Sequence, residues 1–187
     1  AAHLAGIGAE VVYGDLRDPA AVRAATADCE SVLHAGALSA PWGRREDFLA
    51  VNVNGTKNVI DACIRVGVGR LVFVSSPSVV FDGRPQIESK EDAPYARRFL
   101  SVYGESKKCA EEAVLDAASA GLGAVILRPK AIFGPGDGAL LPRLVAAARR
   151  GRLVEIGDGT NRVDLTYVDN VVDAVVRALD SSGARGV

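Results

Sequence analysis

The sequence predicts an α/β fold in which a doubly wound parallel sheet carries helices on both faces. Short β-branched or apolar runs alternate along the chain with stretches whose apolar residues have helical spacing. The connections between them are short, which favours strand–helix–strand units. One run, residues 70–76, is continuously apolar until it ends in serines, as expected for a strand buried on both faces. Alternation of this kind is typical of a parallel sheet.

Length and composition indicate one globular unit that can bury a real core. The chain has 187 residues, of which 49% are hydrophobic and 24% are charged, and its formal net charge is −1. This balance gives no sign of a nucleic-acid or membrane-surface partner. No apolar run approaches the length of a membrane span. Three cysteines without metal-ligand spacing indicate reduced thiols, no metal site and a cytoplasmic protein.

The first third of the chain predicts two strands and a helix. Residues 10–16 are a short β-branched run that ends in a turn. Asp18 and Pro19 then open a helix, with Asp18 as the N-cap and Pro19 at the first helical position. The next strand is 31–34, and the small residues 35–37 follow it directly.

The rest of the chain predicts two long helices and two buried strands. Residues 46–66 have helical spacing of apolar residues, and the buried strand 70–76 follows. A second long helix is expected over 101–120, with Ser101 as its N-cap. Residues 124–129 form the last apolar strand of the alternation.

Ligands of such sheets bind beyond the carboxyl ends of the strands. The residues that follow the predicted strands are therefore informative: Asp15 and Leu16, Ala35 to Ala37, Ser75 and Ser76, and Arg128 and Pro129. The small side chains at 35–37 would let a flat or phosphorylated ligand approach the backbone. A tight strand-to-loop turn explains them equally well.

Tyr103 and Lys107 lie four residues apart at the start of the second long helix. Residues i and i+4 share a helix face, so the phenol and the ammonium should point into the same space. A neighbouring cation lowers the pKa of a phenol and makes it a usable proton donor or acceptor near neutral pH. Taken alone, such a pair is more often a solvated helix face, and a chance match in this chain has odds of about one in ten.

Six short motifs support the catalytic interpretation, because they resemble the extended short-chain dehydrogenases/reductases, the NAD-dependent epimerase/dehydratase superfamily. They are residues 14–16 (GDL), 32–37 (VLHAGA), 52–59 (NVNGTKNV), 74–76 (VSS), 103–107 (YGESK) and 128–129 (RP). They occur in register along nearly the whole chain. The resemblance implies a Rossmann-like fold and an NAD- or NADP-dependent dehydrogenase or reductase.

The resemblance also implies roles for individual residues. Tyr103 would be the general acid or base on the substrate oxygen, Lys107 would lower its pKa and bind the nicotinamide ribose, and Ser76 would hydrogen-bond the reacting oxygen. The implied cofactor-binding residues are Asp15, Leu16, Ala35, Gly36, Ala37, Asn52, Val74, Tyr103, Lys107, Pro129 and Ile132. For Asn52, an amide bonded to backbone inside the helix is equally expected.

The segment after the last strand indicates a branch of the family. Residues 128–137 (RPKAIFGPGD) resemble the 3β-hydroxysteroid dehydrogenase group, and Ala131 stands where nucleotide-sugar enzymes tend to have asparagine. The resemblance is to sterol-4α-carboxylate 3-dehydrogenases and 2-alkyl-3-oxoalkanoate reductases, which act on a hydroxyl or ketone of a hydrophobic substrate. A nucleotide-sugar epimerase or dehydratase, and a non-catalytic dinucleotide-binding protein, remain alternatives.

The chain departs from the family pattern at both ends. Gly6-Ile7-Gly8 precedes a strand-like run and is not the glycine-rich phosphate-binding turn. We therefore expect a partial NAD(P)-binding domain over 1–187, with 130–167 as the start of the substrate-binding region. The first strand–helix–strand unit and most of the C-terminal substrate domain would be lacking. By the same resemblance, helices 46–66 and 101–120 would form a homodimer interface.

Overall fold

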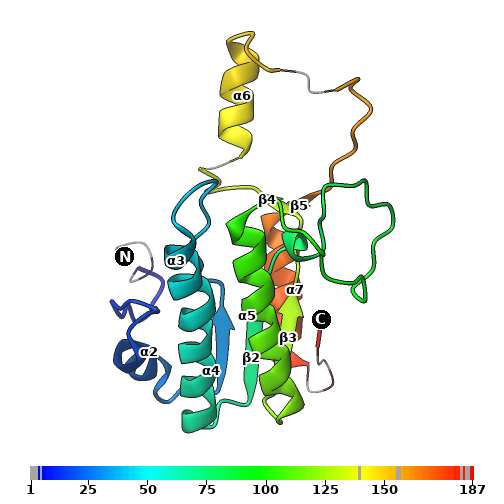
Figure 1. The fold of residues 1–187 in the computed structure, drawn as a ribbon. Coiled ribbons are helices and arrows are strands. Elements are labelled where there is room, and N and C mark those ends of the chain that lie inside the picture. The colour runs from blue at the N-terminus through cyan, green and yellow to red at the C-terminus, as the bar shows by residue number, and fades with distance from the viewer. Residues whose placement is uncertain (1–3, 5, 139, 155–156, 182, 184–185) are drawn as a thin grey trace.

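A parallel three-stranded sheet lies at the centre of the molecule (Figure 1). The computed structural model describes residues 1–187 except 1–3, 5, 139, 155–156, 182 and 184–185. The strands are β1 (Ser31–His34), β2 (Arg70–Val74) and β3 (Ala124–Leu127), in the order β1-β2-β3. In register, Leu33 lies beside Val72, and Phe73 lies beside Ile126. The predicted parallel α/β sheet is confirmed.

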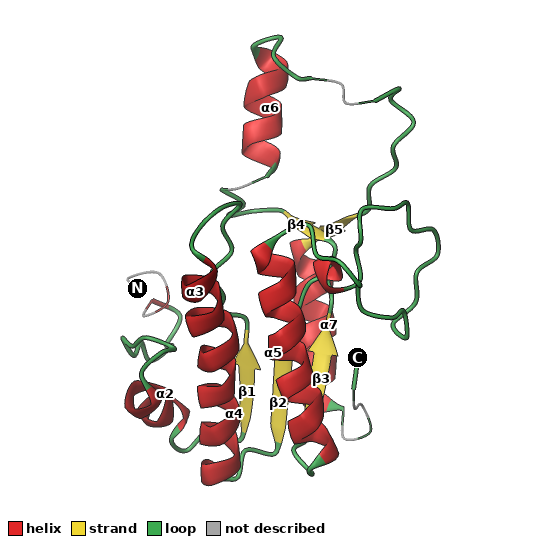
Figure 2. Ribbon diagram, in the orientation of Figure 1, coloured by secondary structure: helices red, strands yellow, loops and turns green. Residues whose placement is uncertain are grey.

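Helices cover both faces of this sheet (Figure 2). Helices α4 (Gly55–Val66) and α5 (Val102–Ser119) pack side by side on one face, and α7 (Val168–Asp180) contacts β2 and β3 from the other. The core between α4, α5 and the sheet is apolar and buried. It includes Val59, Ala62, Cys63, Leu71, Phe73, Ala110, Val114 and Ile126.

The strand predicted over residues 10–16 is not formed. The backbone there is irregular, and Val12 and Tyr13 are 54% and 82% exposed. β-branched residues favour strands only where a neighbouring strand completes the ladder. In the described part of the chain, β1 pairs with β2 alone, so the run does not add a strand at the other edge of β1. The helix after it, α2 (Pro19–Thr26), begins as predicted, with the Asp18 carboxylate accepting from Ala20 N at 2.9 Å.

The long helix predicted over 46–66 is continuous but irregular. It begins with α3 (Arg45–Phe48), widens to a π-helical segment over Leu49–Asn54 and continues as α4. Gly67 ends it with a positive φ of 79°, and its N–H donates to Cys63 O at 3.0 Å. The sequence did not predict the π-helical segment, although such segments are frequent at functional sites.

A small second sheet lies beyond the carboxyl ends of β1 to β3. It pairs β4 (Ala131–Phe133) with β5 (Leu165–Tyr167) in parallel. Between them, α6 (Leu141–Arg149) stands away from the main sheet and has no buried residue (Figure 1). In the part of the chain that the structure describes, no helix is long and apolar enough to cross a membrane.

Candidate active site

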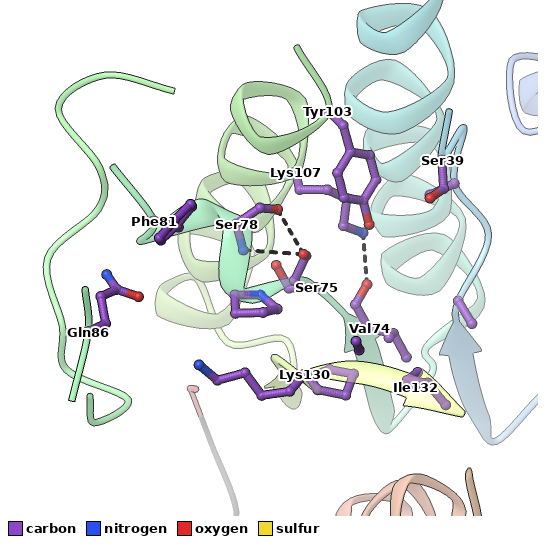
Figure 3. A pocket seen from close by; sticks show the side chains of 16 residues that line it. Ser39, Val74, Ser75, Ser78, Phe81, Gln86, Tyr103, Lys107, Lys130 and Ile132 are labelled. Atoms are coloured by element: carbon purple, nitrogen blue, oxygen red, sulfur yellow. Dashed lines mark hydrogen bonds between the residues drawn. The ribbon is translucent and has the colours of Figure 1, made fainter. Parts of the chain in front are cut away.

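A cavity of about 620 Å³ opens at the carboxyl ends of the central strands (Figure 3). It brings together residues from the loop after β1, the end of β2 and the loop after it, α5, the segment that joins β3 to β4, and β4. The lining residues are Ala35, Ala37, Ser39, Val74, Ser75, Ser76, Pro77, Ser78, Phe81, Gln86, Tyr103, Lys107, Pro129, Lys130, Ala131 and Ile132. The three residues predicted to be catalytic are all among them.

The start of helix α5 places Tyr103 over this cavity. Ser101 caps the helix, because its hydroxyl accepts from Gly104 N at 3.1 Å. Gly104 lets the first turn approach the 3₁₀ segment over Pro77–Val79, since a Cβ there would lie 3.1 Å from Ser78 O. The turn that carries the tyrosine is therefore held close to Ser76.

The phenol of Tyr103 lies between two serines. Burial raises its pKa, and hydrogen bonds with Ser76 and Ser39 act in the opposite direction. The lowering of the tyrosine pKa by Lys107 stays a prediction.

Lys107 is buried in the same cavity wall and is only 2% exposed. Its ammonium donates to Val74 O at 2.7 Å and lies 4.0 Å from the centre of the Phe73 ring. Burial lowers its pKa to about 8, against a smaller opposing effect from Glu111. The tyrosine and lysine share one face of the helix, as predicted, but the ammonium is held by strand β2.

Ser76 ends β2 and begins the short 3₁₀ segment. Its side chain accepts from Ser78 N at 3.3 Å and lies 2.8 Å from the Ser78 hydroxyl. Ser76 and Tyr103 line the same cavity, and Ser76 acts to lower the pKa of the phenol, so the two hydroxyls lie near each other. The predicted juxtaposition of Ser76 and Tyr103, 27 residues apart, is therefore observed.

Asn52 does not line the cavity, and its cofactor role stays a prediction. It is 2% exposed and lies in the π-helical segment. Its amide accepts from Leu38 N at 2.7 Å, and donates to Leu38 O at 3.1 Å and to the Ser106 hydroxyl at 2.9 Å. These bonds hold the loop that carries Ser39 against helix α5. Asn52 therefore supports the cavity wall without lining the cavity.

A buried cluster centred on Glu111 was missed in the sequence. Glu111 is fully buried, one turn of α5 beyond Lys107. Its carboxylate accepts from Ser75 Oγ at 2.5 Å, from the Tyr95 hydroxyl at 2.9 Å and from Arg128. The cluster ties the ends of β2 and β3 and the segment near Tyr95 to the catalytic helix. The spacing of residues 103, 107 and 111 at one-turn intervals was the only sequence signal for it.

A second cavity, of about 450 Å³, continues the first along the sheet edge. Ala35 lines both, and Asp15, Leu16 and Gly36 line the second. Asn58 holds the Leu16 carbonyl at 2.8 Å, and a Cβ at Gly55 would lie 2.9 Å from Leu16 Cβ. Of the ten predicted cofactor residues other than Asn52, seven line the first cavity and four line the second, with Ala35 in both. The two cavities together are called the groove below.

His34 ends β1 beneath this groove. It is 4% exposed, and its Nε2 lies 2.9 Å from the Thr56 hydroxyl. Burial, with a smaller contribution from the Lys107 charge, lowers the pKa of His34 to about 4. The histidine is therefore neutral at physiological pH and has a structural place in the wall between β1 and α4.

Comparison with known proteins gives several relatives, among them a reductase and a dehydrogenase. A 2-alkyl-3-oxoalkanoate reductase of Stenotrophomonas maltophilia is 44% identical over 94% of this chain and 54% of that protein. The sterol-4-alpha-carboxylate 3-dehydrogenase, decarboxylating, of Homo sapiens is 38% identical over 89% of this chain and 46% of that protein. The chain spans about half the length of these relatives.

Solved structures share the fold. MoeE5, solved with UDP-glucose and NAD, is 34% identical, with a TM-score of 0.78 over 94% of this chain and 60% of that one. A short-chain dehydrogenase/reductase superfamily protein of Agrobacterium tumefaciens with bound NAD is 29% identical, with a TM-score of 0.79 over 97% and 65%.

These likenesses agree with the geometry of the site. The Rossmann-like sheet, with Tyr103, Lys107 and Ser76 at one cavity, is the arrangement that the sequence motifs predicted. The model of the 3-beta hydroxysteroid dehydrogenase/isomerase family matches residues 3–182, nearly the whole chain. The chain therefore belongs to the 3-beta hydroxysteroid dehydrogenase/isomerase family, within the extended short-chain dehydrogenases/reductases.

Proposed function

We propose that this protein is an NAD(P)-dependent oxidoreductase that interconverts a hydroxyl and a ketone on a hydrophobic substrate. The observation that carries the proposal is that Tyr103, Ser76, Ser39 and Lys107 line one cavity, where the two serines act to lower the pKa of the phenol. One proton-transferring group, two hydroxyls that can hold a carbonyl oxygen, and one cation are what the reaction requires of the protein.

Each of these residues has a separable task. Tyr103 gives a proton to the substrate oxygen in reduction and takes it back in oxidation. Ser76 donates a hydrogen bond to the same oxygen and fixes it beside the phenol. Lys107 lies one helical turn deeper, where its ammonium can leave Val74 O for a cofactor hydroxyl. A bound nicotinamide cofactor supplies or accepts the hydride.

We infer that the cofactor lies along the groove. Asp15 and Leu16 flank one end, and Lys107 and Ile132 lie at the other. The solved relatives MoeE5 and the Agrobacterium tumefaciens protein both contain NAD. This supports a nicotinamide dinucleotide in the groove, and we leave NAD and NADP as alternatives.

The substrate wall favours a carbon skeleton over a sugar. Phe81, Ala131, Ile132 and Pro129 present apolar surface to the cavity. A sugar needs several aligned polar partners, and a pocket built for them would leave polar groups unpaired with an apolar ligand. The names of the curated relatives, a 2-alkyl-3-oxoalkanoate reductase and a sterol-4-alpha-carboxylate dehydrogenase, support the same substrate class.

A nucleotide-sugar enzyme is the second candidate, because MoeE5 was solved with UDP-glucose and with UDP-glucuronic acid.

A parallel screen distinguishes the oxidoreductase of hydrophobic substrates from the nucleotide-sugar enzyme. Protein from the complete reading frame is incubated with sterols, 2-alkyl-3-keto acids and UDP- or GDP-sugars, and nicotinamide absorbance is followed. Since epimerisation gives no net absorbance change, the sugars are also analysed by chromatography. Converted sugars with inert sterols and keto acids would select the second candidate, and binding without turnover of either would indicate a non-catalytic dinucleotide-binding protein.

A further inference from the structure

The charged residues that line the substrate cavity are all positive. Its lining contains two lysines, Lys107 and Lys130, and no carboxylate. The ammonium of Lys107 is taken by Val74 O and lies over an aromatic ring. Lys130 is the remaining cation of the lining, so any negative group that a substrate brings would meet it first.

The ammonium of Lys130 has only a loose partner. It lies 3.9 Å from the Asp164 carboxylate, which is beyond hydrogen-bonding distance. The two side chains are 42% and 82% exposed. An exposed pair at that separation contributes little free energy. Lys130 can therefore turn from Asp164 to a bound anion at small cost.

Lys130 also has a suitable place in the fold. It lies between Leu127, where β3 ends, and Ala131, where β4 begins. Figure 3 shows Lys130 and Ile132 on the opposite side of the cavity from Tyr103. A substrate that lies between these walls has its reacting oxygen at the tyrosine and its substituents towards Lys130.

The chemistry of a β-keto acid matches this arrangement. Its carboxylate carbon is two bonds from the reacting carbonyl carbon, so a cation that recognises the carboxylate must line the same cavity as the catalytic tyrosine. A hydrogen bond to a charged group contributes roughly 1.5–3 kcal/mol, which is enough to select an acid over a neutral ketone.

We propose that Lys130 binds the carboxylate of a β-keto or β-hydroxy acid and makes the cavity selective for acids over neutral ketones of the same skeleton. This inference rests on the proposed function and names a specificity residue within it. The carboxylate implied by the names of both curated relatives is consistent with it.

Lys130→Gln tests the proposal in protein from the complete reading frame. A 2-alkyl-3-keto acid and its methyl ester share the reacting ketone and differ in charge. We expect Lys130→Gln to raise KM for the acid about tenfold or more and to change KM for the ester by less than twofold. Lys130→Arg should retain the preference for the acid, and Lys57→Gln, an exposed lysine on α4, is the matched control.

Equal effects of Lys130→Gln on acid and ester would overturn the proposal, because the lysine would then not recognise the carboxylate. A raised KM for the cofactor with unchanged acid selectivity would overturn it as well, since Lys130 would belong to the cofactor site.

A binding measurement keeps this result separate from the proposed function. A 2-alkyl carboxylic acid without the ketone, and its methyl ester, are titrated calorimetrically into wild type and Lys130→Gln. Tighter binding of the acid that is lost in the variant supports the lysine even if no ketone is turned over. Equal binding of acid and ester by the wild type would overturn the proposal.

Discussion

The ammonium of Lys107 donates a 2.7 Å hydrogen bond to the carbonyl oxygen of Val74, the last residue of strand β2. The same ammonium lies 4.0 Å from the centre of the Phe73 ring. The ammonium of Lys107, which the sequence predicted to act on the Tyr103 phenol, is thus bound to strand β2. A Lys107 that binds the cofactor, as proposed above, would have to give up its bond to Val74 O.

Replacing Lys107 tests this arrangement. Burial lowers the pKa of Lys107 to about 8, so its charge is present below that pH and is lost as pH rises through it. We expect kcat/KM for the cofactor to fall above about pH 8 in wild type. In Lys107→Met this alkaline fall should be absent, cofactor affinity weaker, and the pH optimum of the residual activity higher. The measurement is steady-state kinetics across pH.

Lys108→Met is the matched control for Lys107→Met. Lys108 is the next residue of α5, and its ammonium pairs with Glu112 at the surface. We expect its pH profile to match wild type. An unmoved profile and unchanged cofactor affinity in Lys107→Met would mean that Lys107 does not serve the cofactor.

His34 should make the protein sensitive to acid. Its pKa is lowered from 6.5 to about 4. Between pH 6.5 and pH 4 the histidine is therefore protonated in the unfolded chain and neutral in the folded chain. Stability is therefore lost as pH falls through this window. From pH 7 to pH 5 the histidine should cost about 2 kcal/mol. His34→Gln should lose correspondingly less, as measured by urea unfolding at the two pH values; an equal loss would contradict the buried, neutral assignment.

The Glu111 cluster should be a large contributor to stability. Glu111→Ala leaves Arg128 with a side chain only 12% exposed and without its carboxylate partner. Breaking a buried pair in this way costs roughly 3–5 kcal/mol. Glu112→Ala, on the same helix, removes a partly exposed ion pair and should cost about 0.5–1 kcal/mol or less. Chemical unfolding of both variants is the measurement, and similar midpoints would contradict the role given to the cluster.

Ser39 should tune the catalytic phenol. Its hydrogen bond lowers the pKa of Tyr103, so Ser39→Ala should raise that pKa further. In the direction of alcohol oxidation the phenol acts as base, and the acidic limb of the rate should move to higher pH. Ser119→Ala, at the far end of α5, is a control without contact to the site. A pH profile that matches wild type would remove Ser39 from the catalytic group.

Local signals predicted much of the fold and the catalytic set. The cap at Ser101, the apolar strands and the i, i+4 spacing of Tyr103 and Lys107 depend on neighbours in the chain and are observed, although β2 and β3 each end two residues before the predicted strands 70–76 and 124–129. The strand over 10–16 was wrong because a strand depends on a partner that its own residues do not specify.

The remaining features depend on contacts between distant segments. Ser39 meets Tyr103 across 64 positions, and Glu111 meets Ser75, Tyr95 and Arg128 from three other segments. A serine in a loop, or a glutamate within a helix, has no local pattern that reveals such a partner. The π-helical segment that buries Asn52 gave no sequence signal either.

Replacing Tyr103 with phenylalanine tests the central claim most directly. The variant keeps the ring that lines the cavity and removes only the hydroxyl that meets Ser76 and Ser39. In protein from the complete reading frame, measured with a substrate that the wild type turns over, we predict that kcat falls by roughly 10²–10⁴-fold. Cofactor affinity, measured by titration, should stay near the wild-type value. Turnover within a few-fold of wild type would contradict the assignment of Tyr103 as the proton-transferring group.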